Sequence, residues 1–364
     1  MRKIKIYIFH PYSKVGGADL SISRLINNLN LKKYNLNFIC LQKPGIKKYL
    51  KKNIKIIKLK SKRTLSAGYE LKKIISNNML EDLKYKKVIF ISNQNFANVI
   101  SILSLNKFKH IKKVLIERNN PVELDFLKNY KNKIIKRLIP LTYSKADMVI
   151  GISKELSHDL SKLAKTKVRT IYNPSFDKSI KNFSSKKKHN NIKTILCVAR
   201  FEKQKNHMML LKAFRLSLKK LKSNLVLVGY GSEKKKIIDF IKKNNLSERI
   251  KIVLNPPNVY DYYKNADLFV LTSLYEGFGN VLVEAGIFKL PIISTKCKSG
   301  PKEILGNGKY GNLVKVNDIK NLSKLINNTL KNPKKEKISL MFKSLNRFTI
   351  ENHIKNYEKV FNEL

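Results

Sequence analysis

The chain has 364 residues, 43% of them hydrophobic, which is enough to fill the cores of two domains of about 150 residues each. Its net charge of +51 divides into +28 over residues 1–175 and +23 over the remaining 189, so the basic residues form no concentrated stripe of the kind that nucleic-acid binding requires. The three cysteines are widely separated and no run of 18 apolar residues occurs, which excludes a disulfide framework, a cysteine zinc site and a membrane-spanning helix, and favours the cytoplasm.

The first half of the chain alternates short β-branched runs with stretches of helical periodicity. Strands are predicted at Ile4–Phe9, Leu36–Leu41, Ile54–Leu59, Val88–Ile91, Lys113–Ile116, Met148–Ile150 and Val168–Ile171. Helices are predicted at Ala18–Leu31, Tyr69–Asn77, Phe96–Leu105 and Lys154–Leu163. This alternation is typical of a parallel, doubly wound sheet.

Asn173-Pro174 and the polar stretch Ser184–Asn191 interrupt the alternation, which then restarts. The second set of strands is predicted at Thr194–Val198, Asn224–Val228, Ile250–Leu254, Leu268–Leu271 and Pro291–Ser294. Its helices are predicted at His207–Leu221 and Glu233–Lys243, and the last segment, roughly Ser344–Leu364, is an amphipathic helix. The sequence therefore predicts two similar α/β domains joined near residues 174–190.

A glycine-containing loop follows the first predicted strand, over residues 10–18 (HPYSKVGGA). Gly16 and Gly17 open the next helix and allow backbone N–H groups to approach an anion at its N-terminus, although a plain turn fits the same residues equally well. His10 begins this loop. It could face a binding site, but a loop histidine without a partner is the interpretation we favour.

Two further loops follow strands of the second set. Arg200 and Lys205 come directly after Thr194–Val198, and two cations at the C-terminal end of a parallel strand can neutralise a diphosphate, with surface lysines as the ordinary alternative. Gly229 and Gly231 follow the next strand and open a helix, but the third glycine of a dinucleotide-binding loop is missing, so NAD binding is not supported.

The stretch Ser273–Ala285 (SLYEGFGNVLVEA) is the most specific motif in the chain. It follows the predicted strand Leu268–Leu271. Gly277 and Gly279, on either side of Phe278, permit a tight loop that leads into a helix. Such a loop directs backbone N–H groups and the positive end of the helix dipole at a phosphate.

Two glutamates flank this loop. The predicted helix begins near Asn280, so Glu284 lies about one turn into it and can accept hydrogen bonds from the hydroxyls of a ribose. Glu276 lies at the start of the loop and can reach the hydroxyls of a sugar. A nearby Ser299-Gly300-Pro301 sequence predicts a second loop that leads into a helix with proline at its first position.

Taken in order, these motifs resemble the family 4 glycosyltransferases of the two-domain GT-B fold. The resemblance is carried by VARFEKQKNH, LVLVGYGSEKKK, NADLFVLTSLYEGFGNVLVEA and SGPKEIL between about residues 192 and 305, and in the first half by VGGAD and IERNNP. It implies two Rossmann-like α/β domains that face across a cleft. Residues 1–175, joined by the C-terminal helix at about 345–364, would bind the acceptor, and residues 176–344 would bind the nucleotide-sugar.

The resemblance also implies roles for single residues. Arg200, Lys205 and Glu276 would be catalytic: the two cations on the donor diphosphate, and the carboxylate on the donor sugar. Glu284 would hold the ribose. The remaining donor-binding positions are Gly16, Gly17, Gly229, Gly231, Gly277, Phe278, Gly279 and Asn280.

The implied reaction retains the anomeric configuration by front-face displacement and needs no metal or cofactor, and the chain contains no DxD sequence. SGPKEIL and ERNNP are most similar to the branch that adds sugars, often N-acetylhexosamines, to lipid-linked oligosaccharides or surface polysaccharides. The expected partners are a nucleotide-sugar, most commonly UDP-linked, and a glycan or polyprenyl-diphosphate-linked acceptor.

The acceptor side departs from the family pattern. Many members carry a His after a mid-domain strand, whereas the strand Lys113–Ile116 is followed by Glu117 and Arg118, which we expect to help position the acceptor. Lys43–Arg63 holds ten basic residues and no acids. This stretch, with Arg63 at its end, either grips a lipid pyrophosphate or an anionic membrane surface, or is an ordinary solvated face.

Two other functions remain open on the sequence alone. A GT-B-fold epimerase or phosphorylase would share the donor motifs, and its product would not depend on a sugar acceptor. A nucleic-acid-binding protein would be stabilised by oligonucleotides at physiological salt.

Overall fold

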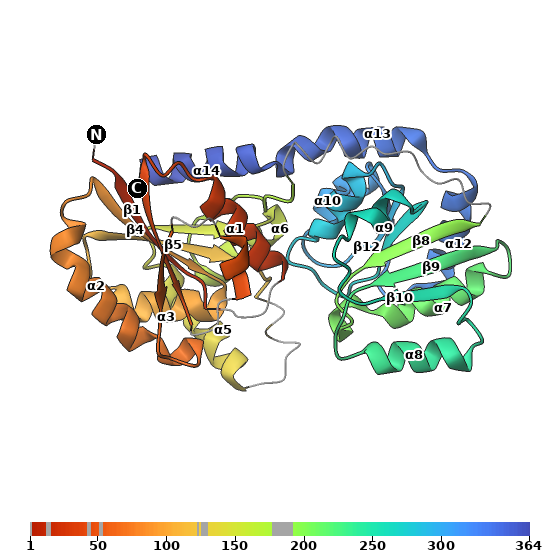
Figure 1. The fold of residues 1–364 in the computed structure, drawn as a ribbon, viewed down its shortest axis with the longest axis horizontal. Coiled ribbons are helices and arrows are strands. Elements are labelled where there is room, and N and C mark those ends of the chain that lie inside the picture. The colour runs from red at the N-terminus through yellow and green to blue at the C-terminus, as the bar shows by residue number, and fades with distance from the viewer. Residues whose placement is uncertain are drawn as a thin grey trace. The chain divides into compact units, whose positions relative to one another are not determined.

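The computed structural model describes residues 2–11, 16–41, 45–50, 54–121, 124, 130–176 and 192–364. The chain divides into two compact units (Figure 1). Unit 1 comprises Met1–Pro174 and Ile350–Leu364, and unit 2 comprises Ser175–Thr349. The polypeptide therefore returns to unit 1 for its last helix.

The described part of unit 1 forms a seven-stranded parallel sheet in the order β3-β2-β1-β4-β5-β6-β7. Its strands are β1 Ile4–Phe9, β2 Tyr34–Cys40, β3 Lys55–Lys58, β4 Lys87–Asn93, β5 Ile111–Glu117, β6 Met148–Gly151 and β7 Val168–Thr170. Its α-helices are α1 Gly17–Asn28, α2 Gly68–Asp82, α3 Asn95–Leu105, α5 Tyr130–Tyr143, α6 Lys154–Ala164 and α14 Ile350–Glu363. Short 3-10 turns lie at Gly45–Tyr49 and Thr64–Ser66.

The described part of unit 2 forms a six-stranded parallel sheet in the order β10-β9-β8-β11-β12-β13. Its strands are β8 Lys193–Val198, β9 Ser223–Val228, β10 Ile250–Val253, β11 Leu268–Leu271, β12 Ile292–Thr295 and β13 Asn312–Val314. Its α-helices are α7 His207–Ser217, α8 Lys234–Lys243, α9 Tyr260–Lys264, α10 Asn280–Ile287, α11 Pro301–Ile304, α12 Ile319–Lys331 and α13 Lys335–Ser344. Single 3-10 turns are η4 Lys203–Lys205, η5 Gly306–Gly308 and η6 Leu345–Phe348.

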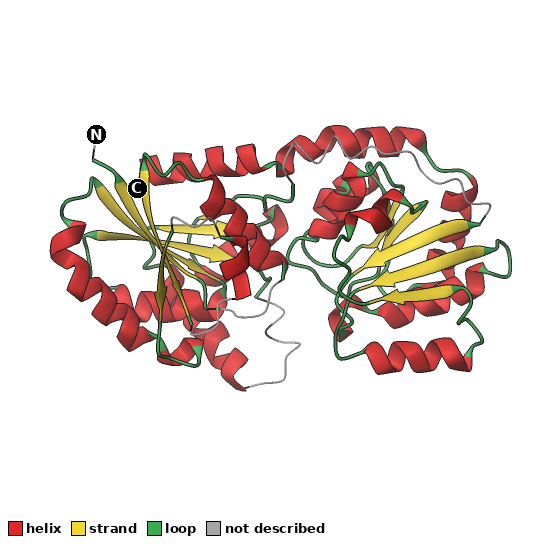
Figure 2. Ribbon diagram, in the orientation of Figure 1, coloured by secondary structure: helices red, strands yellow, loops and turns green. Residues whose placement is uncertain are grey.

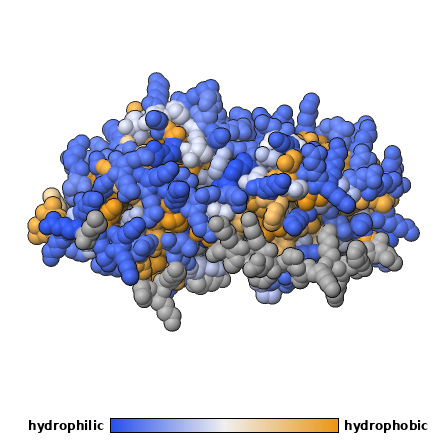
Figure 3. Space-filling view, turned by 90° about the horizontal axis from the view of Figure 1, so that it is seen from above, coloured by the Kyte–Doolittle hydropathy of each residue, from blue (hydrophilic) through white to orange (hydrophobic). Residues whose placement is uncertain are grey.

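Both sheets are buried in the middle of their units, with helices packed against them (Figure 2). Central strands such as Ile6–Phe9 and Leu268–Leu271 are fully buried, as expected when helices cover both faces of a parallel sheet. The face seen in Figure 3 is mostly hydrophilic, with apolar side chains in scattered patches, which agrees with the even spread of lysine in the sequence. Among the helices that the structure describes, none is both long and apolar enough to cross a membrane.

The expected pair of parallel-sheet α/β units is confirmed, and each strand predicted from the sequence is present to within a few residues. The predicted helix over Ser344–Leu364 is wrong in its first turn. Leu345–Phe348 is a 3-10 turn and Thr349 is extended, so α14 begins at Ile350, where the chain returns to unit 1. Residues 177–191, which include most of the predicted joint, lie outside the described residues.

Candidate functional site

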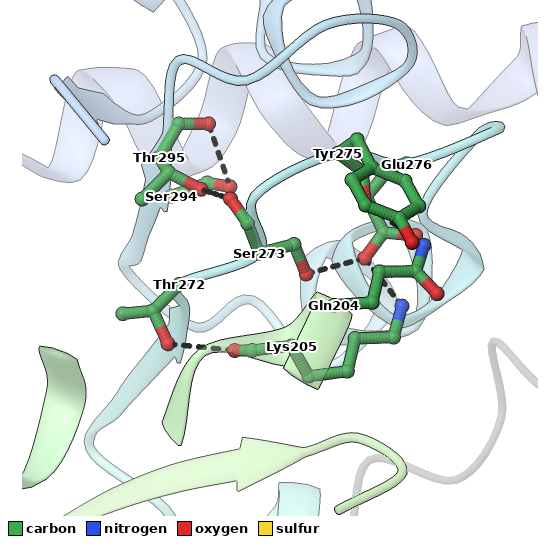
Figure 4. Close-up of polar contacts among 8 residues, drawn as sticks. All are labelled: Gln204, Lys205, Thr272, Ser273, Tyr275, Glu276, Ser294 and Thr295. Atoms are coloured by element: carbon green, nitrogen blue, oxygen red, sulfur yellow. Dashed lines mark hydrogen bonds and ion pairs between the residues drawn. The ribbon is translucent and has the colours of Figure 1, made fainter. Parts of the chain in front are cut away.

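Glu276 and Lys205 form an ion pair at the C-terminal edge of the unit 2 sheet (Figure 4). Lys205 ends η4, which follows β8, and Glu276 lies in the loop after β11. The Lys205 Nζ is 2.5 Å from Glu276 Oε1, and Ser273 Oγ donates to the same oxygen over 2.6 Å. The Glu276 residue is only 5% exposed, so its charge is compensated by two donors rather than by water.

Hydrogen bonds between the two loops fix this pair in place. The Leu274 N–H donates to the Gln204 carbonyl over 2.8 Å, and Gln204 Nε2 donates to the Tyr275 carbonyl over 2.9 Å. From the other side, Thr295 Oγ1 at the end of β12 donates to the Ser273 carbonyl over 2.6 Å. The loops after three neighbouring strands therefore hold Glu276 as one assembly.

α10 begins directly after this loop, as the sequence predicts. Gly279 is its N-cap at φ +103°, a conformation that glycine adopts without strain, and Asn280 is the first helical residue. Glu284 lies one turn in, half-buried, and its Oε2 accepts a hydrogen bond of 2.8 Å from the Tyr263 hydroxyl. Burial and the Glu284 carboxylate raise the pKa of Tyr263 well above its ordinary value, so this hydroxyl remains a donor.

The structure separates the predicted loop residues by environment. The Gly277 position is half-buried, whereas the Phe278 side chain is packed edge-on against Phe348 at a centroid distance of 5.3 Å and is buried. Phe278 therefore fixes the loop from inside unit 2. The Asn280 side chain accepts a hydrogen bond of 3.1 Å from Ser175 Oγ.

Gly229 and Gly231 are required by the close approach of two backbones. A Cβ on Gly229 would lie 2.0 Å from the Ala199 carbonyl oxygen, and one on Gly231 would lie 2.4 Å from that of Phe201. The Phe201 N–H donates to the Tyr230 carbonyl over 2.7 Å across this contact. These glycines thus bring the loop after β9 against the segment that carries Arg200.

Arg200 itself is exposed, and its guanidinium has no hydrogen-bond or ion-pair partner among the residues that the structure describes. It lies between the buried residues Ala199 and Phe201, five residues before Lys205. The segment therefore presents a cation to solvent at the same edge of the sheet as the Lys205–Glu276 pair.

In unit 1, the structure corrects the expectation that His10 has no partner. His10 is completely buried at the C-terminal end of β1, with its Nε2 2.8 Å from Asp19 Oδ1 and its Nδ1 2.7 Å from Asn93 Nδ2. Asp19 Oδ2 in turn accepts from the Gly16 N–H over 2.9 Å at the start of α1. Gly17 is exposed as the first residue of that helix. Residues 12–15 of the predicted glycine loop lie outside the described residues.

The predicted acceptor-side residues Glu117 and Arg118 are both buried at the end of β5. Glu117 Oε1 accepts from the Arg118 N–H over 2.9 Å, and its Oε2 accepts from the Tyr143 hydroxyl over 2.7 Å. Arg118 Nε and Nη1 donate to Asn93 and Asn173 over 2.5 and 2.7 Å. Both side chains are therefore too deeply buried to contact the sugar acceptor directly.

We expect Glu117 to make unit 1 less stable as the pH rises from about 5 to 7. Burial raises the pKa of Glu117 from 4.5 to about 7, so the folded state holds a proton that the unfolded state has already released in this range. The stabilisation is complete below the unfolded pKa and is lost as the pH rises through the folded pKa, by about 3 kcal/mol in all. Urea unfolding of the wild type and Glu117→Gln at pH 5 and pH 7 measures this. An equal pH dependence in the two proteins would contradict it.

Arg63, the third residue predicted for the acceptor side, is exposed and directly precedes the 3-10 turn Thr64–Ser66. The basic stretch Lys43–Arg63 is only partly placed, because residues 42–44 and 51–53 lie outside the described residues. Arg63 follows β3, and the strands β2, β1 and β4 separate β3 from β5, so the structure does not bring Arg63 together with Glu117 or Arg118.

Sequence reasoning missed several residues of these sites. Ser273 and Tyr263 hold the two glutamates, and Asp19, Asn93 and Asn173 hold His10 and Arg118. Two signals were present in the sequence: Asp19 lies two residues after the paired glycines, and Asn93 lies two residues after the predicted strand Val88–Ile91. Their partners are distant in the chain, so the contacts themselves were not predictable.

Comparisons with known proteins agree with this architecture. Residues 178–339 match the family model described as "Glycosyl transferases group 1". The chain is 30% identical over 296 residues to an uncharacterized glycosyltransferase of Methanocaldococcus jannaschii, a match that covers 75% of this chain and 72% of that protein.

A second relative comes from Campylobacter jejuni. It is the N-acetylgalactosamine-N,N'-diacetylbacillosaminyl-diphospho-undecaprenol 4-alpha-N-acetylgalactosaminyltransferase, 27% identical over 347 residues, with 87% of each chain covered. Among solved structures, the Anabaena protein HepE in complex with UDP and glucose aligns with a TM-score of 0.81 at 18% identity, covering 99% of this chain and 100% of that one. At this identity the structural likeness concerns the fold, and it confirms the expected GT-B class.

Proposed function

The chain belongs to the group 1 glycosyltransferases, and we propose that it transfers a hexose or N-acetylhexosamine from a UDP-sugar to a glycan or lipid-linked oligosaccharide in surface polysaccharide synthesis. UDP is proposed because HepE binds it in the structure that resembles this chain. A lipid-linked acceptor is proposed because the Campylobacter relative is named for its undecaprenol-linked substrate. On this proposal the enzyme works in the cytoplasm, at the inner face of the plasma membrane.

The observation that carries the proposal is the Lys205–Glu276 pair beside the start of α10. One of the three ammonium protons of Lys205 is used on Glu276, which leaves two for oxygens of a diphosphate. Arg200 adds a planar guanidinium that can contact two oxygens at once. The N-terminus of α10 contributes a positive partial charge and backbone donors.

These groups suit the departure of a nucleoside diphosphate. In a front-face displacement the bond from the anomeric carbon to the diphosphate oxygen breaks, and the diphosphate leaves with its electron pair. The oxygen of the acceptor hydroxyl bonds to the same face of the carbon, and the hydroxyl proton passes to the departing diphosphate oxygen. Arg200, Lys205 and the α10 N-terminus would stabilise the negative charge that develops on it, without a metal ion. Glu276 would hold hydroxyls of the sugar, and Glu284 those of the ribose.

We expect UDP and its matching UDP-sugar to stabilise the protein against heat. A ligand at 100 times its dissociation constant adds about 2.7 kcal/mol to the free energy of unfolding, which corresponds to a rise of about 5 to 10 °C in the melting temperature of a unit of this size. Thermal unfolding with UDP-sugars, and with oligonucleotides at physiological salt as the control, measures this. Stabilisation by oligonucleotides alone would point to nucleic-acid binding instead.

The substrate is then identified by a screen of UDP-sugars with lipid-linked acceptors, analysed by mass spectrometry. A product that gains one sugar mass only when donor and acceptor are both present supports the proposal. A sugar isomer or a sugar phosphate formed without that acceptor would overturn it in favour of an epimerase or a phosphorylase. The same assay in excess EDTA tests independence from metal ions.

A further inference from the structure

A continuous series of hydrogen bonds, buried in all but its last member, links Arg118, after β5, to the first turn of α1. Arg118 Nε donates to Asn93 Oδ1 over 2.5 Å. Asn93 Nδ2 lies 2.7 Å from His10 Nδ1, and His10 Nε2 lies 2.8 Å from Asp19 Oδ1. Asp19 Oδ2 accepts from the Gly16 N–H over 2.9 Å. These hydrogen bonds thus run across the C-terminal ends of β5, β4 and β1 in turn.

The direction of every bond in this series follows from its first member. A guanidinium can only donate, so Asn93 must present its oxygen to Arg118 and its NH₂ group to His10. His10 Nδ1 must then accept, which leaves the ring proton on Nε2. This Nε2–H donates to Asp19, whose second oxygen remains free for the Gly16 amide. Arg118 therefore selects one tautomer of His10.

Arg118 is itself fixed from a second side. Its Nη1 donates to Asn173 Oδ1 over 2.7 Å, and the same oxygen accepts from Ser21 Oγ of α1 over 3.2 Å. Among the described residues, two charged groups face His10: Asp19 from α1 and Arg118 from the loop after β5. Burial, which outweighs the opposing effect of Asp19, lowers the pKa of His10, so the ring is neutral at physiological pH.

We propose that Arg118 is a positioning residue, which acts through Asn93, His10 and Asp19. The hydrogen bond from Gly16 to Asp19 anchors the start of α1, so that other backbone N–H groups of its first turn are oriented to bind the donor diphosphate. This inference rests on the proposed function, because it assumes that the N-terminus of α1 meets the donor. It assigns to Arg118 a role in donor binding, where the sequence suggested the acceptor.

The first variant, Asp19→Asn, places a new NH₂ donor opposite the Gly16 N–H donor. An amide has one oxygen, which must face the His10 Nε2–H as long as Arg118 dictates that tautomer. The introduced NH₂ group then meets the Gly16 N–H, which loses its acceptor. We expect the KM for the UDP-sugar to rise about tenfold, the effect of one lost hydrogen bond, with a smaller change in kcat.

The second variant, Asn93→Asp, offers His10 an acceptor on each side. Its ring must carry a proton on both nitrogens to satisfy them, so we expect His10 to be an imidazolium at pH 7. The ¹⁵N chemical shifts of a histidine-labelled sample distinguish this form from the Nε2–H tautomer expected in the wild type.

The decisive sample is the double variant Asp19→Asn/Asn93→Asp, which keeps the wild-type charge. The carboxylate at position 93 now accepts from Arg118 and from His10 Nδ1–H. The unprotonated His10 Nε2 accepts from the NH₂ group of the amide at position 19, and the oxygen of that amide accepts from the Gly16 N–H. Every bond is satisfied again in the opposite sense, so we expect the donor KM to return to within about twofold of the wild type, with the His10 proton on Nδ1.

Asn173→Asp is the matched control. It places the same new charge against the same guanidinium without touching His10, so the His10 tautomer should not change. If the double variant shows the combined defects of the single ones, or if wild-type His10 carries its proton on Nδ1, the proposal is overturned. The wild-type spectrum decides this even if a single variant does not fold. A wild type that neither binds UDP nor transfers sugar would instead defeat the proposed function.

Discussion

Replacing Glu276 by glutamine is expected to reduce kcat at least about 100-fold while the protein stays folded. The carboxylate accepts from Lys205 and Ser273 through one oxygen, which leaves its second oxygen for a hydroxyl of the donor sugar. Glutamine keeps the size of the side chain and one acceptor but loses the charge, in a position where charge-assisted hydrogen bonds stabilise the transition state. Initial rates at saturating UDP-sugar measure the effect.

The matched control for this variant is Glu81→Gln. Glu81 also pairs with a lysine, Lys5, over 3.2 Å, but it lies on the surface of unit 1 and Lys5 keeps Asp82 as its partner. Transfer by this control should equal that of the wild type. Full transfer activity in Glu276→Ala, on the other hand, would show that the site has been assigned to the wrong residues.

Gly300→Ala is expected to lower the free energy of unfolding of unit 2 by at least about 3 kcal/mol. Gly300 has φ +72°, and a Cβ there would lie 1.8 Å from the carbonyl oxygen of Phe278, a backbone atom that cannot move away by a rotamer change. The loop before α11 would have to separate from the loop that carries Glu276. Urea unfolding monitored by circular dichroism measures the loss.

Gly308→Ala separates the two causes of this loss. Gly308 also has a positive φ, +100°, but no atom lies within 4 Å of the position of its Cβ. Its replacement should therefore cost only the conformational penalty of about 1–2 kcal/mol. If both variants lose the same stability, the close contact at Phe278 does not contribute.

Strands and the donor loop were predictable because their signals are local. The apolar run Leu268–Leu271 and the two glycines after it are complete within a dozen residues, and the structure places β11, the loop and α10 where the sequence indicates. β13 was not predictable, because Asn312–Val314 is only three residues long and is half exposed, and its pairing with β12 defines it.

The hydrogen-bond partners of His10 could not be predicted from the sequence, for a different reason. Its partner Asn93 is 83 residues away, and only the strand order β1-β4-β5 brings the ends of these strands together. After β5, where the family resemblance led us to look for a histidine, this chain has Glu117 and Arg118. A histidine does lie at this edge of the sheet, but it comes from β1 and is completely buried.

The return of the chain to unit 1 has a consequence for how the protein is made. The last helix of unit 1, α14, buries Tyr357, Val360 and Phe361, and Phe361 packs edge-on against Tyr34 of β2. On the ribosome these residues are synthesised after all of unit 2. The apolar surface of unit 1 that α14 covers therefore stays exposed while unit 2 is being synthesised. Unit 2 is continuous in sequence and can finish folding first. The N-terminal half is thus begun first and completed last, so its apolar surface stays exposed to aggregation for longer than that of unit 2.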